Sequence, residues 1–489
     1  MNKRQDTSTH TDTSTPRSST VLLNLTDRVH AEAETGYAEH DFLVPAGTQT
    51  LRIYLTYCDA MLFLAVLGPD GFRGSTMRPK LRGRVTLEMM ISTTDASPGC
   101  LPGPLPEGQW CLRIDHDVNH AGTEYHVLAV AFPDSSTIAS GSGSVPDIPP
   151  IPPEHRISGE AGWYRGELHA HSRHSDGTSS PAVVAAAAEA AELDYISLTD
   201  HNTFSGWSPM RQALTGRTLL IRGCEVTSRR GHANLHGLDG PIDVFVDRLG
   251  YGMNELADEV HERSELFCVN HAFSGDLGWR VEEFDLDKAD LMEVIHALEG
   301  PNNNNQLALW DHHLLVGRRI VGVAGTDSHH PTEGAHALGP LTTDVYCDEL
   351  TESGVIDGLR RGMVVATYGP RVGFEASDGT RTRRMWERLP CLTNIELTVS
   401  IEYTEPVRVF VLKNGYPFAY RYVDIPGENV CVVSDTPRDS CYYRVEVHRV
   451  LPPHGPEAQG VPEWILRSRR DYRSVLAVTN PIFVSNTED

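Results

Sequence analysis

The pattern of apolar and polar positions divides the chain into three parts. Between residues 20 and 135, short runs alternate with a period of two, as in Leu51–Leu55, Trp110–Ile114 and Tyr125–Val130. Turns rich in Gly, Pro and Asp separate these runs, and strands patterned in this way predict an N-terminal β-sandwich. The same alternation returns at residues 390–486, where we expect a C-terminal β-sandwich.

The middle part, residues 163–375, follows a different pattern. Short apolar runs such as Asp194–Leu198 and Ile320–Ala324 alternate with longer segments that carry helix signals. One helix is expected at Pro181–Leu193, because Ser180 can cap it and Pro181 suits its first turn. Further helices are expected at residues 254–266 and 306–315. Repeated strand–helix units of this kind predict a parallel sheet or barrel.

Two segments lack such patterns. Residues 1–19 are polar and rich in Ser and Thr, which predicts a disordered tail, and residues 136–162 are a linker rich in Ser, Gly and Pro. The N-terminus has no apolar core of a secretory signal, and no run of 18 apolar residues occurs. We therefore expect no membrane span.

Composition narrows the function. Among 489 residues, 66 acidic and 42 basic side chains give a net charge of −24, which argues against binding to nucleic acid or anionic lipid. The nine cysteines are scattered and form no CxxC pair, so free thiols and a cytoplasmic location are expected. The N-terminal β-segment shows no chemical cluster, and its expected role is scaffold or oligomer contact.

Histidines and acids of the middle part follow the ends of apolar runs. These positions are His169, His171, Asp176, His201, Glu225, His232, His271, Asp327 and His329. The carboxyl ends of strands in a parallel barrel converge on one face, where such folds place their chemistry. His169 and His171, two residues apart, share one side of a strand. The pattern therefore predicts one polar site built from many strand ends.

The donor types indicate a metal centre. Mixed imidazole and carboxylate donors suit Zn²⁺, Mn²⁺ or Fe²⁺, and Glu225 can bridge two ions. Two ions about 3.5–4 Å apart activate a bridging hydroxide for hydrolysis. The chain has no nucleophile elbow, Walker-type loop or dinucleotide fingerprint. Asp327 or His329 could move the proton, and Arg229, Arg230, Arg280 or Arg371 could bind an anionic group of the substrate.

Several of these motifs together resemble the PHP (polymerase and histidinol phosphatase) family. They are His169-x-His171, Ser175-Asp176-Gly177, Thr199-Asp200-His201-Asn202, Asn270-His271 and Asp327-Ser328-His329. Outer segments such as Gly68–Gly74 and Thr479–Ile482 look like its carbaryl-hydrolase-type branch. The resemblance implies an α/β plus β architecture, in which a distorted (β/α)7 barrel of TIM-like type stands between two β-sandwiches.

The resemblance also implies a di- or trinuclear centre of divalent metals. His169, His171, Glu225 and Asp327 would hold one ion, Glu225, His271 and His232 a second, and Asp176, His201 and His329 a third. Asp176 stands where many members have His, and His236 is an alternative to His232. Five nearby histidines are expected to support the ligands or to lie at the surface: His174, His296, His312, His313 and His330. If one of them binds metal instead, we expect it to be His330. Glu293 is read as a pocket or supporting group.

Three functions remain open at this point. The first is hydrolysis of a phosphoester in a small molecule, the commonest activity of the resembled family. The second is hydrolysis of a carboxylic or carbamate ester or an amide, as the branch implies. The third is a metal-bound scaffold without catalysis. A phosphatase should present an Arg or Lys to the metals and an esterase a mostly apolar wall. The β-domains are expected to cover the barrel mouth or to form a homodimer interface.

Overall fold

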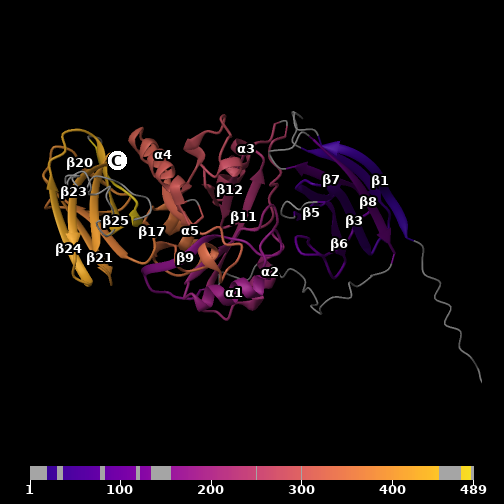
Figure 1. Ribbon diagram of the computed structural model, residues 1–489, viewed down its shortest axis with the longest axis horizontal. Helices are drawn as coiled ribbons and strands as arrows, with labels where there is room; N and C mark the ends of the chain where they lie inside the picture. Colours follow the sequence, from indigo (N-terminus) through magenta and orange to yellow (C-terminus); the bar gives the residue numbers. More distant parts are fainter. Residues whose placement is uncertain are drawn as a thin grey trace, which may run out of the picture.

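The computed structural model describes residues 19–29, 37–77, 83–116, 122–133, 156–248, 250–298, 300–450 and 475–485. The predicted tail and most of the predicted linker lie outside these residues. Figure 1 shows the N-terminal strands at one end of the molecule, the C-terminal strands at the other, and mixed strands and helices between them. The protein is therefore a mixed α/β protein with many strands and few helices.

The N-terminal part consists of two four-stranded antiparallel sheets. One sheet has the order β1 (Thr20–Val29), β8 (Thr123–Phe132), β3 (Thr50–Cys58), β6 (Arg84–Ser92). The other has the order β2 (Ala38–Val44), β7 (Gly108–His116), β4 (Leu62–Gly68), β5 (Gly71–Thr76). Alternate residues of both sheets, such as Leu51, Ile53, Leu112 and Ile114, are fully buried in a shared core. The predicted alternation therefore reflects a sandwich with one buried face on each sheet.

Seven strands of the central part follow one another in chain order. They are β9 (Gly162–Ala170), β10 (Tyr195–Leu198), β11 (Leu219–Ser228), β12 (Gly231–His236), β13 (Leu266–Val269), β14 (Leu291–His296) and β15 (Val321–Gly325). Neighbours are parallel except at β12, which is antiparallel to both β11 and β13. A parallel bridge between Ala170 and Ser328 joins the ends of β9 and β15. The first and last strands of the row therefore meet where their carboxyl ends lie.

Five α-helices accompany these strands. They are α1 (Pro181–Ala190), α2 (Trp207–Ala213), α3 (Met253–Glu262), α4 (Asn303–Leu315) and α5 (Glu352–Arg360), with short 3-10 turns η1 (Gly275–Leu277), η2 (Leu286–Lys288), η3 (Gly300–Asn302) and η4 (Gly334–His336). The Ser180 side chain caps α1 by accepting the backbone N–H of Val183, as predicted. The helix ends three residues before the predicted Leu193, because Glu192 adopts a left-handed conformation with φ 55°.

The strand–helix repeat is broken at one place. β11 continues to Ser228, beyond the apolar run Leu219–Ile221 seen in the sequence, and turns at Arg229 and Arg230 directly into β12. Glu225 and His232, one from each strand of this hairpin, are buried and belong to the site described below. The predicted (β/α)7 barrel stays a prediction, since this step has a hairpin in place of a helix.

The C-terminal part continues the central sheet. β16 (Thr342–Cys347) pairs with β9 and leads through β17 (Val364–Thr367) to β26 (Val475–Thr479), β25 (Cys441–Arg449), β22 (Val407–Lys413) and β23 (Tyr416–Val423), while β20 (Arg388–Pro390) and β27 (Ile482–Ser485) pair beside them. A separate sheet has the order β19 (Thr382–Arg384), β18 (Arg371–Ser377), β21 (Ile395–Tyr403), β24 (Gly427–Asp435). Both share one apolar core. A hairpin turn at Asn414–Gly415 joins β22 and β23, and both residues have the positive φ that such a turn needs.

Two further expectations concern the chain as a whole. All nine cysteines are free, and six of them are buried, as the scattered spacing predicts. Among the described residues, no helix combines the length and apolar character that crossing a membrane requires.

Candidate metal centre

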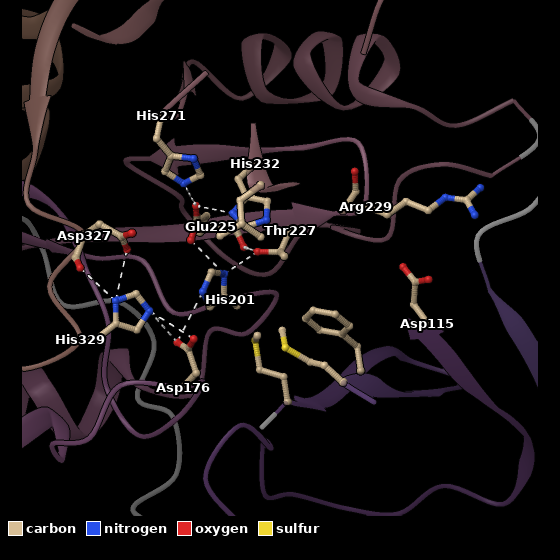
Figure 2. A pocket seen from close by; sticks show the side chains of 15 residues that line it. Asp115, Asp176, His201, Glu225, Thr227, Arg229, His232, His271, Asp327 and His329 are labelled. Carbon is tan, nitrogen blue, oxygen red and sulfur yellow. Dashed lines mark hydrogen bonds and ion pairs between the residues drawn. The ribbon is translucent and has the colours of Figure 1, made fainter. Parts of the chain in front are cut away.

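The predicted site residues gather at the carboxyl ends of the central strands. Figure 2 shows Asp176, His201, Glu225, His232, His271, Asp327 and His329 around one cavity. Two of the connecting residues, Asn202 and Asp327, adopt left-handed backbone conformations with φ 50° and 53°. Such a conformation is uncommon outside glycine and concentrates at functional sites. At Asp327 it follows directly on the end of β15 and helps to direct the carboxylate toward the cluster.

Four donor atoms form a compact quartet. Glu225 Oε2 lies 3.3 Å from His169 Nε2 and 3.4 Å from His171 Nε2, and Asp327 Oδ1 lies 3.4 Å and 2.9 Å from the same nitrogens. A tetrahedral ion with bonds of about 2.0–2.2 Å needs donor atoms separated by roughly 3.3–3.6 Å. The quartet approaches this spacing without rearrangement. It unites the four residues that the sequence assigned to the first ion.

The other oxygen of Glu225 faces a second group of donors. Oε1 lies 3.1 Å from His232 Nδ1 and 3.2 Å from His271 Nε2, and it accepts the amide N–H of Asn270 at 2.9 Å. His201 Nδ1 approaches Oε2 at 2.9 Å. Glu225 therefore stands between two sets of imidazoles, as a carboxylate that bridges two ions must.

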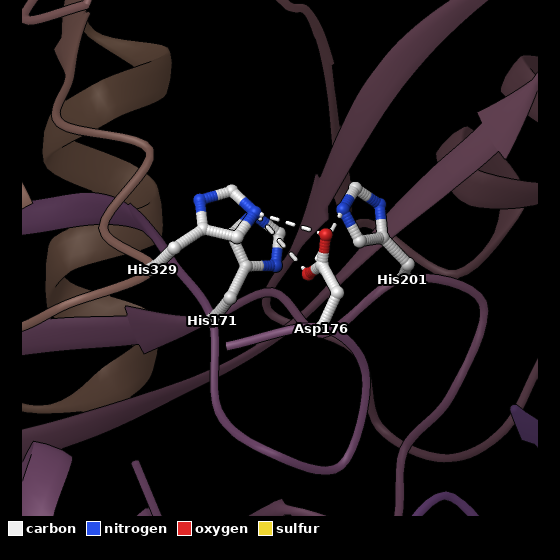
Figure 3. Close-up of side chains that lie close together, drawn as sticks. All are labelled: His171, Asp176, His201 and His329. Carbon is white, nitrogen blue, oxygen red and sulfur yellow. Dashed lines mark hydrogen bonds and ion pairs between the residues drawn. The ribbon is translucent and has the colours of Figure 1, made fainter. Parts of the chain in front are cut away.

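A third group surrounds Asp176, as Figure 3 shows. Asp176 Oδ1 lies 3.2 Å from His329 Nε2 and 3.5 Å from His201 Nε2, and His171 borders the same group. The hydrogen bond and charge of Asp176, helped by Asp327, outweigh burial and raise the pKa of His329 to about 10. The residues assigned to a third ion are thus also together, with His171 facing both the first and the third group.

Unpaired buried atoms test whether these residues suit a metal. His169 Nε2, Asp176 Oδ1 and Glu225 Oε2 face the cluster, are buried and have no hydrogen-bond partner. Leaving polar atoms buried without partners costs about 1–3 kcal/mol each, and native proteins rarely tolerate a cluster of them. Divalent ions would satisfy the atoms that point into the cluster. The residues present therefore fit a metal centre.

The charges of the cluster point the same way. Burial would raise the pKa of Glu225, but nearby His169 and His201 outweigh it and hold that pKa well below its usual value. Burial also opposes ionisation of Asp327, yet His169 is the strongest of the neighbours that hold its pKa well below the usual range. Both carboxylates are therefore anionic inside the protein, which favours the binding of cations.

Two buried glutamates hold the ligands in place. Glu293 Oε1 lies 2.7 Å from His169 Nδ1, and its other oxygen accepts the backbone N–H of His271 at 2.8 Å. Glu167 accepts the backbone N–H groups of His169 and Thr326 at 2.8 and 3.1 Å, which ties β9 to the loop that carries Asp327. A carboxylate on the far nitrogen of a metal-ligating histidine fixes the ring and raises its basicity. The supporting role expected for Glu293 matches this position.

Glycine at position 325 is needed for this arrangement. A Cβ added to Gly325 would lie 1.9 Å from Glu293 Oε1. Gly325→Ala should therefore displace Glu293 from His169 and weaken metal binding by roughly 10–100-fold, the usual effect of losing such a support. Competition with a chelating dye measures the affinity. Gly240→Ala is the matched control, because a Cβ there meets nothing within 4 Å, and equal losses in both variants would contradict the expectation.

The structure separates the histidines that the sequence left open. His232, opposite Thr227 on the β11–β12 hairpin, contacts Glu225, whereas His236 Nδ1 lies 3.0 Å from Ser197 Oγ. His330 bonds to Thr178 at 2.9 Å and does not join any of the donor groups.

His296 is the nearby histidine that does reach the cluster. It is 1% exposed, neither ring nitrogen has a hydrogen-bond partner, and Nε2 lies 3.7 Å from Asp327 Oδ2. It is the last residue of β14, so the strand-end rule used for the other ligands would have found it.

The four candidate arginines do not gather at the cluster. Arg229 lines the cavity, but Figure 2 shows it with Asp115 on the far side from Asp327 and His329. Arg230 pairs with Glu283 and Asp247, and Arg280 donates to backbone carbonyls at 2.6 and 2.7 Å. Arg371 lies in a separate groove beside Glu402. Of the four, the geometry brings Arg229 alone to this cavity.

One side of the cavity is formed by the N-terminal sandwich, and a cover for the mouth of the site is one of the two positions expected for the β-domains. The volume of the cavity is about 90 Å³, and the cavity lies between the cluster and the N-terminal sandwich. Met61, Phe63, Met77 and Asp115 of the sandwich line it, together with Leu277. The N-terminal sandwich, expected to be a scaffold or an oligomer contact, therefore lies at the mouth of the site. Local patterns could not identify the individual residues of this side, since the cavity joins segments that are far apart in the chain.

Comparison with known proteins gives limited information. No protein-family model matches the chain, and no curated protein sequence matches it. Similar solved structures include a two-domain protein of Bacteroides vulgatus that contains a predicted PHP-like metal-dependent phosphoesterase. It is 15% identical, the match covers 64% of this chain and 95% of that one, and the TM-score is 0.37.

Two other solved structures have similar descriptions. A protein of Bifidobacterium adolescentis named as a metal-dependent phosphoesterase is 16% identical over 40% of this chain and 94% of its own, with a TM-score of 0.26. An amidohydrolase of Chromobacterium violaceum, solved with sulfate and no metal, is 17% identical over 34% and 87%, also with a TM-score of 0.26. These values are too low to carry an argument, so the functional assignment must come from the site itself.

Proposed function

We propose that the chain is a metal-dependent hydrolase that cleaves an ester bond in a small molecule. The position of Glu225 carries this proposal, because its two oxygens face separate sets of imidazoles. A carboxylate in this position would hold two ions, as the carboxylates of two-metal hydrolases do. Nearly every donor in the cluster is a group that also binds Zn²⁺, Mn²⁺ or Fe²⁺ in enzymes.

The proposal assigns the donors to two or three ions. His169, His171, Glu225 and Asp327 would hold the first, Glu225, His232 and His271 the second, and Asp176, His201 and His329 the third. When bound, such ions supply the Lewis acidity that makes water nucleophilic at neutral pH and polarises the oxygen of the ester.

Exposure indicates which side chains meet the substrate. The side chains of His169 and His171 are 0% exposed, whereas those of Asp327 and His329 are 16% and 21% exposed and line the cavity. Asp327 Oδ1 lies 3.5 Å from His329 Nδ1. We assign to these two residues the transfer of the proton between the attacking water and the leaving group, while His169 and His171 only hold metal.

Two classes of ester remain candidates, with a phosphoester as the first. Arg229 is the one arginine or lysine among the described residues that lines the cavity, and it offers a positive charge to an anionic group of the substrate on the side away from Asp327 and His329. The apolar wall of Met61, Phe63, Met77 and Leu277 favours the second candidate, a carboxylic or carbamate ester. A cavity with few cations is less suited to the dianion of a phosphomonoester.

A panel of model substrates tests the proposal. Protein loaded with Mn²⁺ or Zn²⁺ is assayed against p-nitrophenyl phosphate, bis-p-nitrophenyl phosphate, p-nitrophenyl acetate and a naphthyl carbamate. We expect turnover of the diester or of the neutral esters above turnover of the monoester, and loss of all turnover after chelation. Cleavage of the carbamate alone would exclude the phosphoesterase, and no turnover of any ester with metal present would refute the hydrolase.

A further inference from the structure

The apolar wall of the cavity belongs to a different part of the chain from the donors opposite it. Met61 and Phe63 come from the start of β4, and Met77 follows β5, all in the N-terminal sandwich. The donors come from the strand ends of the central part. Among the residues that the structure describes, Leu277 is the one apolar lining residue that comes from the central part, which carries the donors. Met61, Phe63 and Met77 face the donors from the sandwich side, which also carries Asp115.

The sandwich is fixed in this position. Thr203 Oγ1 donates to the Gly99 carbonyl at 2.8 Å, directly beside the loop that carries His201. The rings of Phe72 and Phe204 meet edge to face with centroids 5.1 Å apart. Ala65 of β4 belongs to the same buried apolar cluster as the central strands. The sandwich that carries the wall is thus held against the central part by hydrogen bonding, ring contact and apolar packing.

The chemistry of the wall limits what it can bind. Two thioethers and a phenyl ring offer no hydrogen bond to a sugar or a second phosphate, but they bind alkyl or aryl groups well. The charged residues Asp115 and Arg229 also line the cavity, but they lie away from the donors in Figure 2. A space of about 90 Å³ between the donors and the wall admits one compact group next to the reacting bond.

We propose that Met61, Phe63 and Met77 of the N-terminal sandwich select the substrate by binding a compact apolar substituent of the ester. This inference rests on the proposed hydrolase function and names its substrate class: a small ester with one alkyl or single-ring aryl group. The central part supplies the reacting groups, and the sandwich supplies the specificity.

Phosphonates test the wall separately from catalysis. Methylphosphonate and phenylphosphonate both offer oxygens to the metals and cannot be hydrolysed as esters, so they differ mainly in the apolar group. Calorimetric titration of Zn²⁺-loaded full-length protein should show phenylphosphonate binding at least about tenfold more tightly, since burial of a ring is worth more than that of a methyl group. Equal affinities, or no binding of either compound, would overturn the proposal.

Variants then locate the preference. Met61→Gln keeps the length of the side chain and makes it polar, and Phe63→Ala removes the ring. Each should lower the phenyl-to-methyl affinity ratio about tenfold. Leu43→Gln is the control, because Leu43 belongs to the same sandwich, is 71% exposed and does not line the cavity. Thermal unfolding of all three variants checks that each remains folded. An unchanged ratio in both Met61→Gln and Phe63→Ala would refute the assignment.

The hydrolase function and the selection of substrate by the apolar wall are overturned by different results. Ester hydrolysis without tighter binding of phenylphosphonate would refute substrate selection by the wall, and the hydrolase function would stand. The opposite result is a preference for phenylphosphonate that both Met61→Gln and Phe63→Ala abolish, in a protein that hydrolyses no ester. It would refute the hydrolase function, and the cavity would be a metal-dependent binding site for anions with an apolar group.

Discussion

Glu225→Gln is expected to remove most of the bound metal and to abolish hydrolysis. Glu225 is fully buried, and its oxygens lie within 3.4 Å of nitrogens of His169, His171, His201, His232 and His271. Glutamine has the same shape but lacks the charge and presents an amide NH₂ to one of these groups. The loss of metal affinity should exceed the roughly 10–100-fold seen when a residue that merely supports a ligand is lost. Elemental analysis of metal per chain and kcat on the best ester measure the two effects.

Glu265→Gln is the matched control for this experiment. Glu265 is another buried glutamate, 2% exposed, whose Oε1 accepts the backbone N–H of Asp239 at 2.8 Å outside the cluster. This variant should keep its metal and its activity even if it is less stable. A Glu225→Gln protein that retains both metal and turnover would show that the bridging carboxylate is wrongly assigned.

Arg444→Met should cause the largest loss of stability. Arg444 of β25 is 0% exposed, and its guanidinium makes two bonds of 2.8 Å to Asp311 of α4 and an ion pair of 2.8 Å with Glu446. Without the arginine, the buried carboxylates of Asp311 and Glu446 lose the positive charge that balances them. Such a loss lowers the free energy of unfolding by about 3–5 kcal/mol in comparable cases. The midpoint of urea unfolding for the C-terminal part should fall accordingly.

An exposed ion pair provides the comparison for Arg444. Arg371 and Glu402 lie 3.4 Å apart with side chains 80% and 59% exposed, so Arg371→Met should shift the midpoint little. Similar shifts of the urea midpoint for Arg371→Met and Arg444→Met would mean that the contact of Arg444 with Asp311 does not stabilise the packing of α4 on the C-terminal strands.

Local patterns in the sequence were sufficient to predict many elements and most of the cluster. The spacing of His169 and His171 places both rings on one side of β9, and apolar runs locate the strand ends that carry His201, His271 and Asp327. These features depend on residues close together in the chain. For the same reason, the runs Leu51–Leu55, Trp110–Ile114 and Tyr125–Val130 fall inside β3, β7 and β8, each of which is longer than the run at both ends.

Features that depend on register or on distant contacts could not be predicted. His232 and His236 lie on the same side of β12, so the period of two cannot distinguish them, and the hairpin register with β11 decides that His232 is closer to Glu225. The apolar wall arises where Met61 and Phe63 meet strand ends far along the chain. Nothing in the alternation of β4 distinguishes a residue that lines a cavity from one that packs in a core.

A crystal structure of metal-loaded protein, with anomalous scattering recorded on both sides of the absorption edge of the metal, tests the central claim most directly. We expect one peak enclosed by His169 Nε2, His171 Nε2, Glu225 Oε2 and Asp327 Oδ1, and a second about 3.5–4 Å away, beside His232 and His271. Absence of both peaks at full metal loading, or metal bound only outside these donors, would contradict the account.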